Sequence, residues 1–121
     1  MNLDGLTPVR LRAFELRVIG LPLVTPFRTS FGTQNDRRIL LVRAITDQGD
    51  GWGECVSGDD PLYSSEYVES SHHVMVHHLI PRLIVDHPVH ASDVARLLEP
   101  VKDHRMAKGA LEAAVLDAQL R

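Results

Sequence analysis

The feature that most constrains this chain is the stretch HRMAKGALEAAVLDAQLR at positions 104–121, which predicts a helix with an unusually large apolar surface. Its polar side chains form only a narrow strip at Lys108, Glu112 and Gln119. A helix that is apolar around most of its circumference is normally buried on several sides. The alanines further indicate close approach of another backbone. We therefore expect this helix to contact a layer that these 121 residues do not contain.

Three strands are predicted before the first helix. Residues 9–19 alternate apolar and charged side chains until Gly20 and Pro22, and residues 38–46 form a run rich in β-branched side chains. The sequence DQGDG then predicts a turn before a third strand at WGECV. The simplest arrangement is an antiparallel three-stranded sheet followed by a helical segment, an α+β fold.

Helical signals follow Pro61. Ser64 or Ser65 is predicted to cap a helix that carries Glu66 and Glu69 in its first turn and is limited or kinked by Pro81. A second, short helix is predicted at DVARLLE, with Ser92 as its cap. We divide the chain into a domain at 1–103 and the helix at 104–121.

Composition and charge exclude several classes of protein. The net charge is −3 and no basic run is present, which argues against nucleic acid as a partner. The N-terminus lacks the apolar stretch of a secretory signal, and no apolar run is long enough for a membrane span. The single Cys55 suits a reducing compartment and is expected to be a buried thiol. We expect a cytoplasmic protein that does not bind membranes.

Two short motifs invite chemical interpretations. The sequence HHVMVHH places His73 and His77 at the i,i+4 spacing of two metal ligands on one helix face, but no third ligand follows at a fixed spacing. We interpret these histidines as a polar helix face. The glycines at 49, 51 and 53 do not match a dinucleotide or phosphate-binding loop.

The segment PFRTSFGTQ is the stronger functional candidate. Phe27 and Phe31 flank Arg28, Thr29 and Ser30 in a stretch punctuated by proline and glycine. Such a composition suits a loop that lines an apolar pocket and excludes water when it closes. The alternative is that both rings anchor the loop onto the local core.

Five blocks, in order along the chain, resemble the N-terminal part of enolase-superfamily enzymes. They are PLVTPFRTSFGTQ, GWGECV, PLYSSEY, LIPRL and HRMAKGALEAAVLDAQLR. Within that superfamily the resemblance is greatest to the N-acylamino acid racemase and o-succinylbenzoate synthase family. It implies a capping domain that packs over the mouth of a (β/α)7β barrel, and the helix at 104–121 would lead into that barrel, which this chain lacks.

In that family, the catalytic residues belong to the barrel. A Lys-x-Lys motif and a further lysine exchange the proton α to a carboxylate, while Asp and Glu side chains hold a divalent metal, Mg²⁺, that stabilises the enediolate. The only lysines here are Lys102 and Lys108, which form no such motif. The resemblance therefore implies that this chain holds neither catalytic residues nor metal ligands and is inert alone.

The resemblance also assigns substrate recognition to the cap. It implies that the loop at 22–36 closes over the active site, with Phe27, Phe31, Arg28, Thr29 and Ser30 as candidate contacts. A second loop at 56–61 adds Ser57 and Gly58. The expected partners are an acyl-amino acid or related small carboxylate and further copies of the protein in a homo-oligomer. The alternatives are the cap of a dipeptide epimerase or muconate cycloisomerase, or a free-standing interaction or self-associating module.

Overall fold

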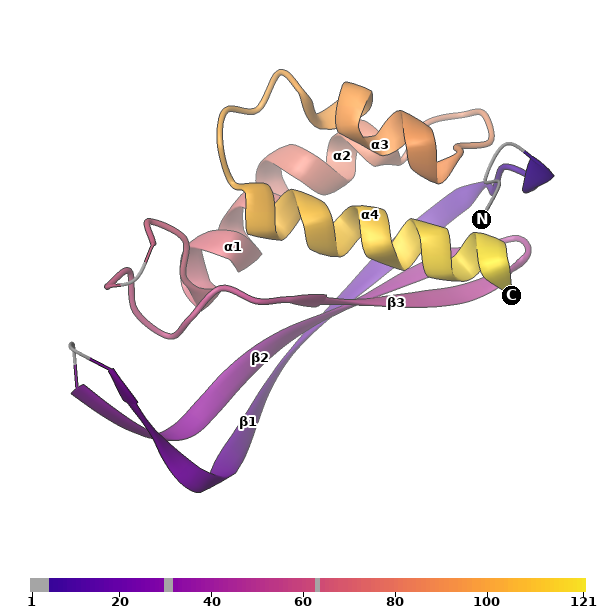
Figure 1. Cartoon of the computed structure of the whole chain (residues 1–121). Coiled ribbons are helices and arrows are strands. Elements are labelled where there is room, and N and C mark those ends of the chain that lie inside the picture. The colour runs from indigo at the N-terminus through magenta and orange to yellow at the C-terminus, as the bar shows by residue number, and fades with distance from the viewer. Residues whose placement is uncertain (1–4, 30–31, 63) are drawn as a thin grey trace.

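The computed structural model describes the backbone of residues 5–29, 32–62 and 64–121, and the side chains of these residues apart from 21–37. An antiparallel sheet is covered on one face by helices (Figure 1). The strands, in the spatial order β1-β2-β3, are β1 (Leu11–Thr29), β2 (Gly32–Thr46) and β3 (Gly49–Cys55). The helices are α1 (Val68–Val74), the π-helical turn η2 (Met75–Leu79), α2 (Ile80–Leu83), α3 (Ala91–Leu98) and α4 (Arg105–Leu120). The predicted fold class is confirmed.

The β1–β2 hairpin is much longer than the sequence pattern predicts. The described part of segment 22–36, expected to be a loop, continues both strands, and the hairpin extends beyond the helical layer in Figure 1. The register shifts between Pro22 and Phe27. Proline has no N–H to donate to a strand ladder, and an irregularity in register is a common way for a hairpin to accommodate it. The loop expectation was therefore wrong for these residues, which form the far end of a ribbon.

The core lies between the sheet and α4. Alternate residues of β2 face the helices and are buried, namely Leu40, Val42, Ala44 and Thr46. On β3 the corresponding positions include Gly51 and Gly53. A Cβ atom on Gly51 would lie 2.0 Å from the carbonyl oxygen of Ala114, and one on Gly53 would lie 2.2 Å from that of Ala110. Glycine is required at both positions because the backbone of α4 lies directly on β3.

This contact corrects one sequence expectation about α4. The alanines do permit close backbone approach, but the approaching layer is β3 of the same chain. Six α4 side chains are buried: Ala107, Ala110, Leu111, Ala114, Val115 and Ala118. Ala113 is exposed and Leu120 retains 47% of its accessible surface. The chain therefore covers most of the apolar surface of α4 and leaves part of its outer face open.

The first helical segment begins later than predicted. Tyr67 precedes α1, and its backbone N–H donates to the Ser70 hydroxyl over 3.1 Å. Glu66, expected in the first turn of this helix, instead accepts hydrogen bonds from the backbone of α4. Pro81 lies in the first turn of α2 and is preceded by η2, so the expected disturbance at this proline takes the form of a π-turn. None of the helices within the described residues is both long and apolar enough to cross a bilayer.

Candidate functional site

The first group of predicted substrate contacts lies at the far end of the hairpin. Phe27, Arg28 and Thr29 are the last residues of β1, and their backbones pair with β2. Their side chains are not among those that the structure describes. Ser30 and Phe31 lie outside the described residues altogether. The structure thus places the backbone of three of these five positions on the ribbon that projects from the domain.

The second group lies in the loop that follows β3. The Ser57 side chain is only 2% exposed, and its hydroxyl accepts a 3.0 Å hydrogen bond from Ser71 and lies 3.4 Å from the thiol of Cys55. Cys55 is itself buried, as predicted. Gly58 is exposed, and its carbonyl oxygen accepts a 2.9 Å hydrogen bond from the backbone of Val68. Ser57 therefore faces the core, whereas Gly58 lies at the surface.

One residue that the sequence interpretation missed connects these parts. The Arg38 guanidinium donates to the Asp59 carboxylate over 2.8 Å and to its carbonyl oxygen over 3.3 Å, and it also donates to the Glu69 carboxylate. These hydrogen bonds, first with Glu69 and then with Asp59, raise the pKa of Arg38 above its ordinary value. The bond to Arg38 correspondingly lowers the pKa of Glu69. Arg38 thus fixes the loop after β3 to both β2 and α1.

No sequence signal could have found this network. Asp59 lies 21 residues after Arg38, and Glu69 lies 31 residues after it, so no local spacing links the three side chains. The hairpin passes the loop at Arg38, whose side chain bonds Asp59 and whose backbone pairs with Gly20 of β1. In Figure 1 the loop and the far end of the hairpin lie at the same end of the molecule, on the left of the view. The two predicted substrate-binding segments therefore share one end of the fold.

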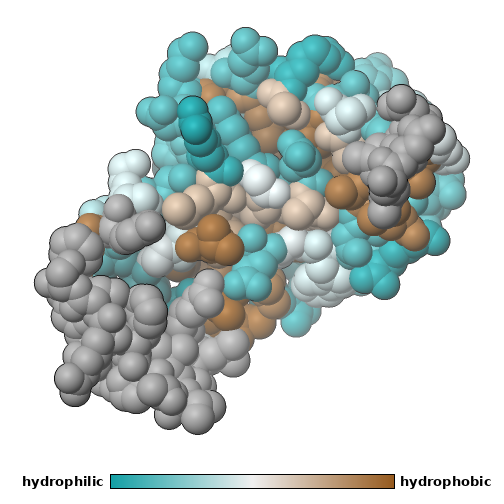
Figure 2. All heavy atoms as spheres, viewed as in Figure 1, coloured by the Kyte–Doolittle hydropathy of each residue, from teal (hydrophilic) through white to brown (hydrophobic). Residues whose placement is uncertain are grey.

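Apolar side chains are exposed near this end. Val56 and Leu62 flank the loop and retain 58% and 59% of their accessible surface, and Val18 on β1 retains 47%. Figure 2 shows hydrophobic residues reaching the surface in several separate patches between hydrophilic ones. Side chains of this size gain free energy when another surface covers them. The end of the fold that carries the predicted site is thus also suited to contact with other protein.

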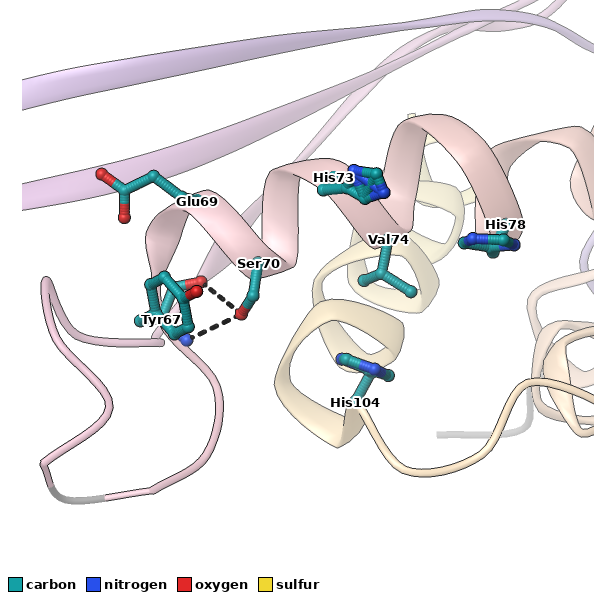
Figure 3. Close-up of a pocket in the computed structure, with 7 residues that line it drawn as sticks. All are labelled: Tyr67, Glu69, Ser70, His73, Val74, His78 and His104. Carbon is teal, nitrogen blue, oxygen red and sulfur yellow. Dashed lines mark hydrogen bonds between the residues drawn. The ribbon is translucent and has the colours of Figure 1, made fainter.

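A surface cavity of about 410 Å³ lies between the first helical segment and the start of α4 (Figure 3). His73 and His78 line it from one side and His104 from the other, with Val74 between them. The Nδ1 atom of His104 is buried and has no hydrogen-bond partner in the described part of the chain. Of the predicted substrate contacts, Ser57 and Gly58 are fully described, and neither lines this cavity.

Comparison with known proteins gives consistent matches. Residues 13–121 match the model of the mandelate racemase / muconate lactonizing enzyme, N-terminal domain. An N-succinylamino acid racemase of Amycolatopsis sp. is 57% identical over 113 residues, which are 93% of this chain and 31% of the relative. An o-succinylbenzoate synthase of Geobacillus stearothermophilus is 35% identical over 103 residues, which are 84% of this chain and 28% of the relative.

The fold agrees with these matches. The solved structure of an N-succinyl Arg/Lys racemase from Bacillus cereus superposes with a TM-score of 0.79 and 30% sequence identity, covering 93% of this chain and 30% of that one. The chain thus spans about 30% of the length of the relatives that it matches. Its sheet, its helices and its sequence from residue 13 onward agree with one family description. The chain belongs to the mandelate racemase / muconate lactonizing enzyme N-terminal domain family, within the enolase superfamily.

Proposed function

We propose that this chain is the substrate-recognising cap of an enzyme that racemises N-succinylamino acids. The observation that carries the proposal is the 57% identity to the Amycolatopsis N-succinylamino acid racemase across 93% of the chain. Relatives that are o-succinylbenzoate synthases match at 35% identity, so formation of o-succinylbenzoate is the second candidate activity. Both reactions begin with removal of a proton α to a carboxylate, which the resemblance assigns to groups outside this chain.

The cap contributes two segments at one end of the fold. We assign substrate contact to the end of the hairpin, with Phe27, Arg28, Thr29, Ser30 and Phe31, and to the surface of the loop after β3. In that loop, exposed Gly58 would face the substrate. Two tethers keep the loop backbone in place, the bond from Ser71 to Ser57 and the ion pair from Arg38 to Asp59. A tethered loop loses less entropy when the substrate binds, which favours affinity.

The divalent metal, Mg²⁺, belongs in this proposal to the remainder of the enzyme. Mg²⁺ prefers several oxygen ligands in near-octahedral geometry. Among the residues that the structure describes, no group of three or more His, Cys, Asp or Glu side chains is arranged to hold a metal ion. The described residues therefore do not fit the family's metal, and we propose for this chain recognition of the substrate without any step of the chemistry.

We also propose that the full-length protein is a cytoplasmic homo-oligomer. The single cysteine of this 121-residue chain, Cys55, is buried and forms no disulfide, which suits a reducing compartment. On the sheet face that is turned away from the helices, Trp52 is 42% exposed and is contacted by the Arg43 guanidinium, 5.6 Å from the ring centroid. Aromatic and arginine side chains are enriched in interfaces between subunits.

A chimeric enzyme tests the proposed function. Residues 1–121 would replace the matched N-terminal region of the Amycolatopsis racemase, and racemisation of N-succinylamino acids would be followed by polarimetry with added Mg²⁺. We expect racemisation within about tenfold of the parent enzyme, because the two caps share most of their residues. The isolated 121-residue chain should be inactive.

The chimera and the native full-length protein together separate the candidate reactions. A chimera that is folded by circular dichroism but racemises no N-succinylamino acid would contradict the proposal. Formation of o-succinylbenzoate, or epimerisation of dipeptides, by the native full-length protein without racemisation of N-succinylamino acids would transfer the cap to one of the alternative enzymes.

A further inference from the structure

The helical segment formed by α1 and η2 carries four histidines: His72, His73, His77 and His78. All four are exposed. The rings of His73 and His77 have centroids 4.4 Å apart, and His78 lies 6.2 Å from His73 and 6.4 Å from His77. Within the described residues, no hydrogen bond joins these three rings to other groups of the protein. They form a cluster of exposed imidazoles, which we call the imidazole cluster.

The π-turn explains how the three rings come together. The backbone N–H of Ile80 donates to the carbonyl oxygen of Met75, five residues earlier. A turn with this spacing places residues five apart on the same face, so it brings His78 round toward His73. Both side chains point toward the cavity in Figure 3. Pro81 accounts for the turn, because it has no N–H to donate to the carbonyl oxygen four residues earlier.

The spacing within the cluster selects one pair. With metal–nitrogen bonds of about 2.0–2.1 Å, two imidazoles at neighbouring coordination positions have ring centroids roughly 4.5–5 Å apart. The 4.4 Å between His73 and His77 is close to this range, whereas both distances to His78 exceed it. The absence of any three-residue metal group among the described residues agrees with a site of two protein ligands.

We propose that His73 and His77 chelate a divalent transition-metal ion of the later first row, such as Ni²⁺, Cu²⁺ or Zn²⁺, with water at the remaining positions. Neutral imidazole is a preferred ligand for these ions, whereas Mg²⁺ prefers oxygen. The sequence interpretation of these side chains as a polar helix face did not include the short distance between their rings in the folded chain. A bound ion would link α1 to η2 and stabilise the segment around the π-turn.

Calorimetric titration of the untagged chain with NiCl2 at about pH 8 tests the proposal, because metal ions and protons compete for the same imidazole nitrogen. We expect one Ni²⁺ per chain and no binding of Mg²⁺. His73→Ala and His77→Ala should each weaken Ni²⁺ binding at least tenfold. His78→Ala and the matched control His72→Ala should change the affinity less than threefold. Thermal unfolding by circular dichroism gives a second measurement. Ni²⁺ should raise the Tm of the wild type and of His72→Ala, in which the His73–His77 pair is intact, but not the Tm of His73→Ala or His77→Ala.

Three results would overturn the proposal. The first is retention of wild-type affinity by His77→Ala, and the second is an equal loss of affinity in His72→Ala, which would indicate scattered adventitious binding. The third is a tenfold loss in His78→Ala, which would show that the ligand pair is assigned wrongly. All four side chains are exposed, so the variants are expected to fold, and their circular dichroism spectra without metal check this.

Discussion

The carboxylate of Glu66 accepts a 3.1 Å hydrogen bond from the backbone N–H of Ala107, 41 residues later in the chain. Both of its oxygens also accept from the N–H of Met106, at 3.1 and 3.0 Å. Glu66 is only 8% exposed, so the start of the first helical segment is bound to the N-terminus of α4 through a buried anion. The unpaired N–H groups and the positive end of the helix dipole both favour a carboxylate at this position.

Replacement of Glu66 by alanine should destabilise the fold by about 1–2 kcal/mol, the usual cost of losing a helix cap. Glu66→Gln should cost less, because its amide oxygen still accepts a hydrogen bond. Urea unfolding followed by circular dichroism measures both. Glu112→Ala removes an exposed glutamate from α4 and should change the free energy of unfolding by less than about 0.5 kcal/mol. Equal losses in Glu66→Ala and Glu112→Ala would show that the carboxylate does not cap α4.

Gly53→Ala should destabilise the chain by about 3 kcal/mol or more, because the new Cβ would lie 2.2 Å from a backbone oxygen of α4 and force the helix off the sheet. Gly109→Ala is the matched control. It places the same methyl group on the exposed side of α4, where nothing lies within 4 Å. That change should stabilise the chain by up to about 1 kcal/mol through helix propensity. A neutral Gly53→Ala would mean that α4 does not lie against β3 as described.

Asp117 on α4 accepts a 2.8 Å hydrogen bond from the backbone N–H of Trp52 and so covers the edge of β3. That bond, together with Arg121, lowers the pKa of Asp117 below its ordinary value of 3.8. A lowered folded-state pKa gives stability that is complete above the unfolded pKa and is lost as the pH falls through the folded value. Asp117→Asn should therefore cost about 1 kcal/mol at neutral pH, and the difference from wild type should disappear in acid.

Urea unfolding of Asp117→Asn at about pH 7 and about pH 2.5 measures this dependence. Glu112→Gln removes an exposed carboxylate from the same helix and controls for the change in net charge. A difference between wild type and Asp117→Asn that is constant between the two pH values would contradict the assignment.

Arg38→Met should release the loop after β3, because it removes the donors to Asp59 and Glu69 together. Amide hydrogen exchange at Val68, whose N–H donates to Gly58, should accelerate, while exchange in the centre of α4 should stay close to wild type.

In the racemase chimera, Arg38→Met should raise KM several-fold with a smaller effect on kcat, since the loop is proposed to bind substrate. Arg17→Met, an exposed arginine of β1 that is paired with Glu15, is the control. Unchanged exchange at Val68 in Arg38→Met would show that Arg38 does not hold the loop.

The sequence pattern was most informative where structure is local. The run rich in β-branched side chains at 38–46 and the turn at DQGDG predicted β2, β3 and their antiparallel pairing. Prediction failed where a local turn signal competed with pairing between strands. Two prolines and a glycine between 22 and 32 indicated a loop, but pairing between the strands continues the hairpin past them with a shifted register. Backbone pairing with a partner strand is a tertiary gain that turn propensity does not report.

The candidate site shows the same contrast between local patterns and contacts made only on folding. The segments that carry it were visible as motifs, whereas the tether from Arg38 to Asp59 and Glu69 depends on side chains that only the folded chain brings together. The hydroxyl of Ser57 likewise points into the core because β3 ends beside Ser71 of α1.

The sequence by itself determined the order of strands and helices, the family and the apolar character of α4, because periodicity and composition act within a single segment. Only the tertiary structure decided that α4 rests on the glycines of β3, that Glu66 caps α4 rather than its own helix, and that a π-turn gathers the imidazoles. The first two depend on contacts between residues remote in sequence, and the third depends on how the helix accommodates a proline. A local sequence pattern reports neither kind of information.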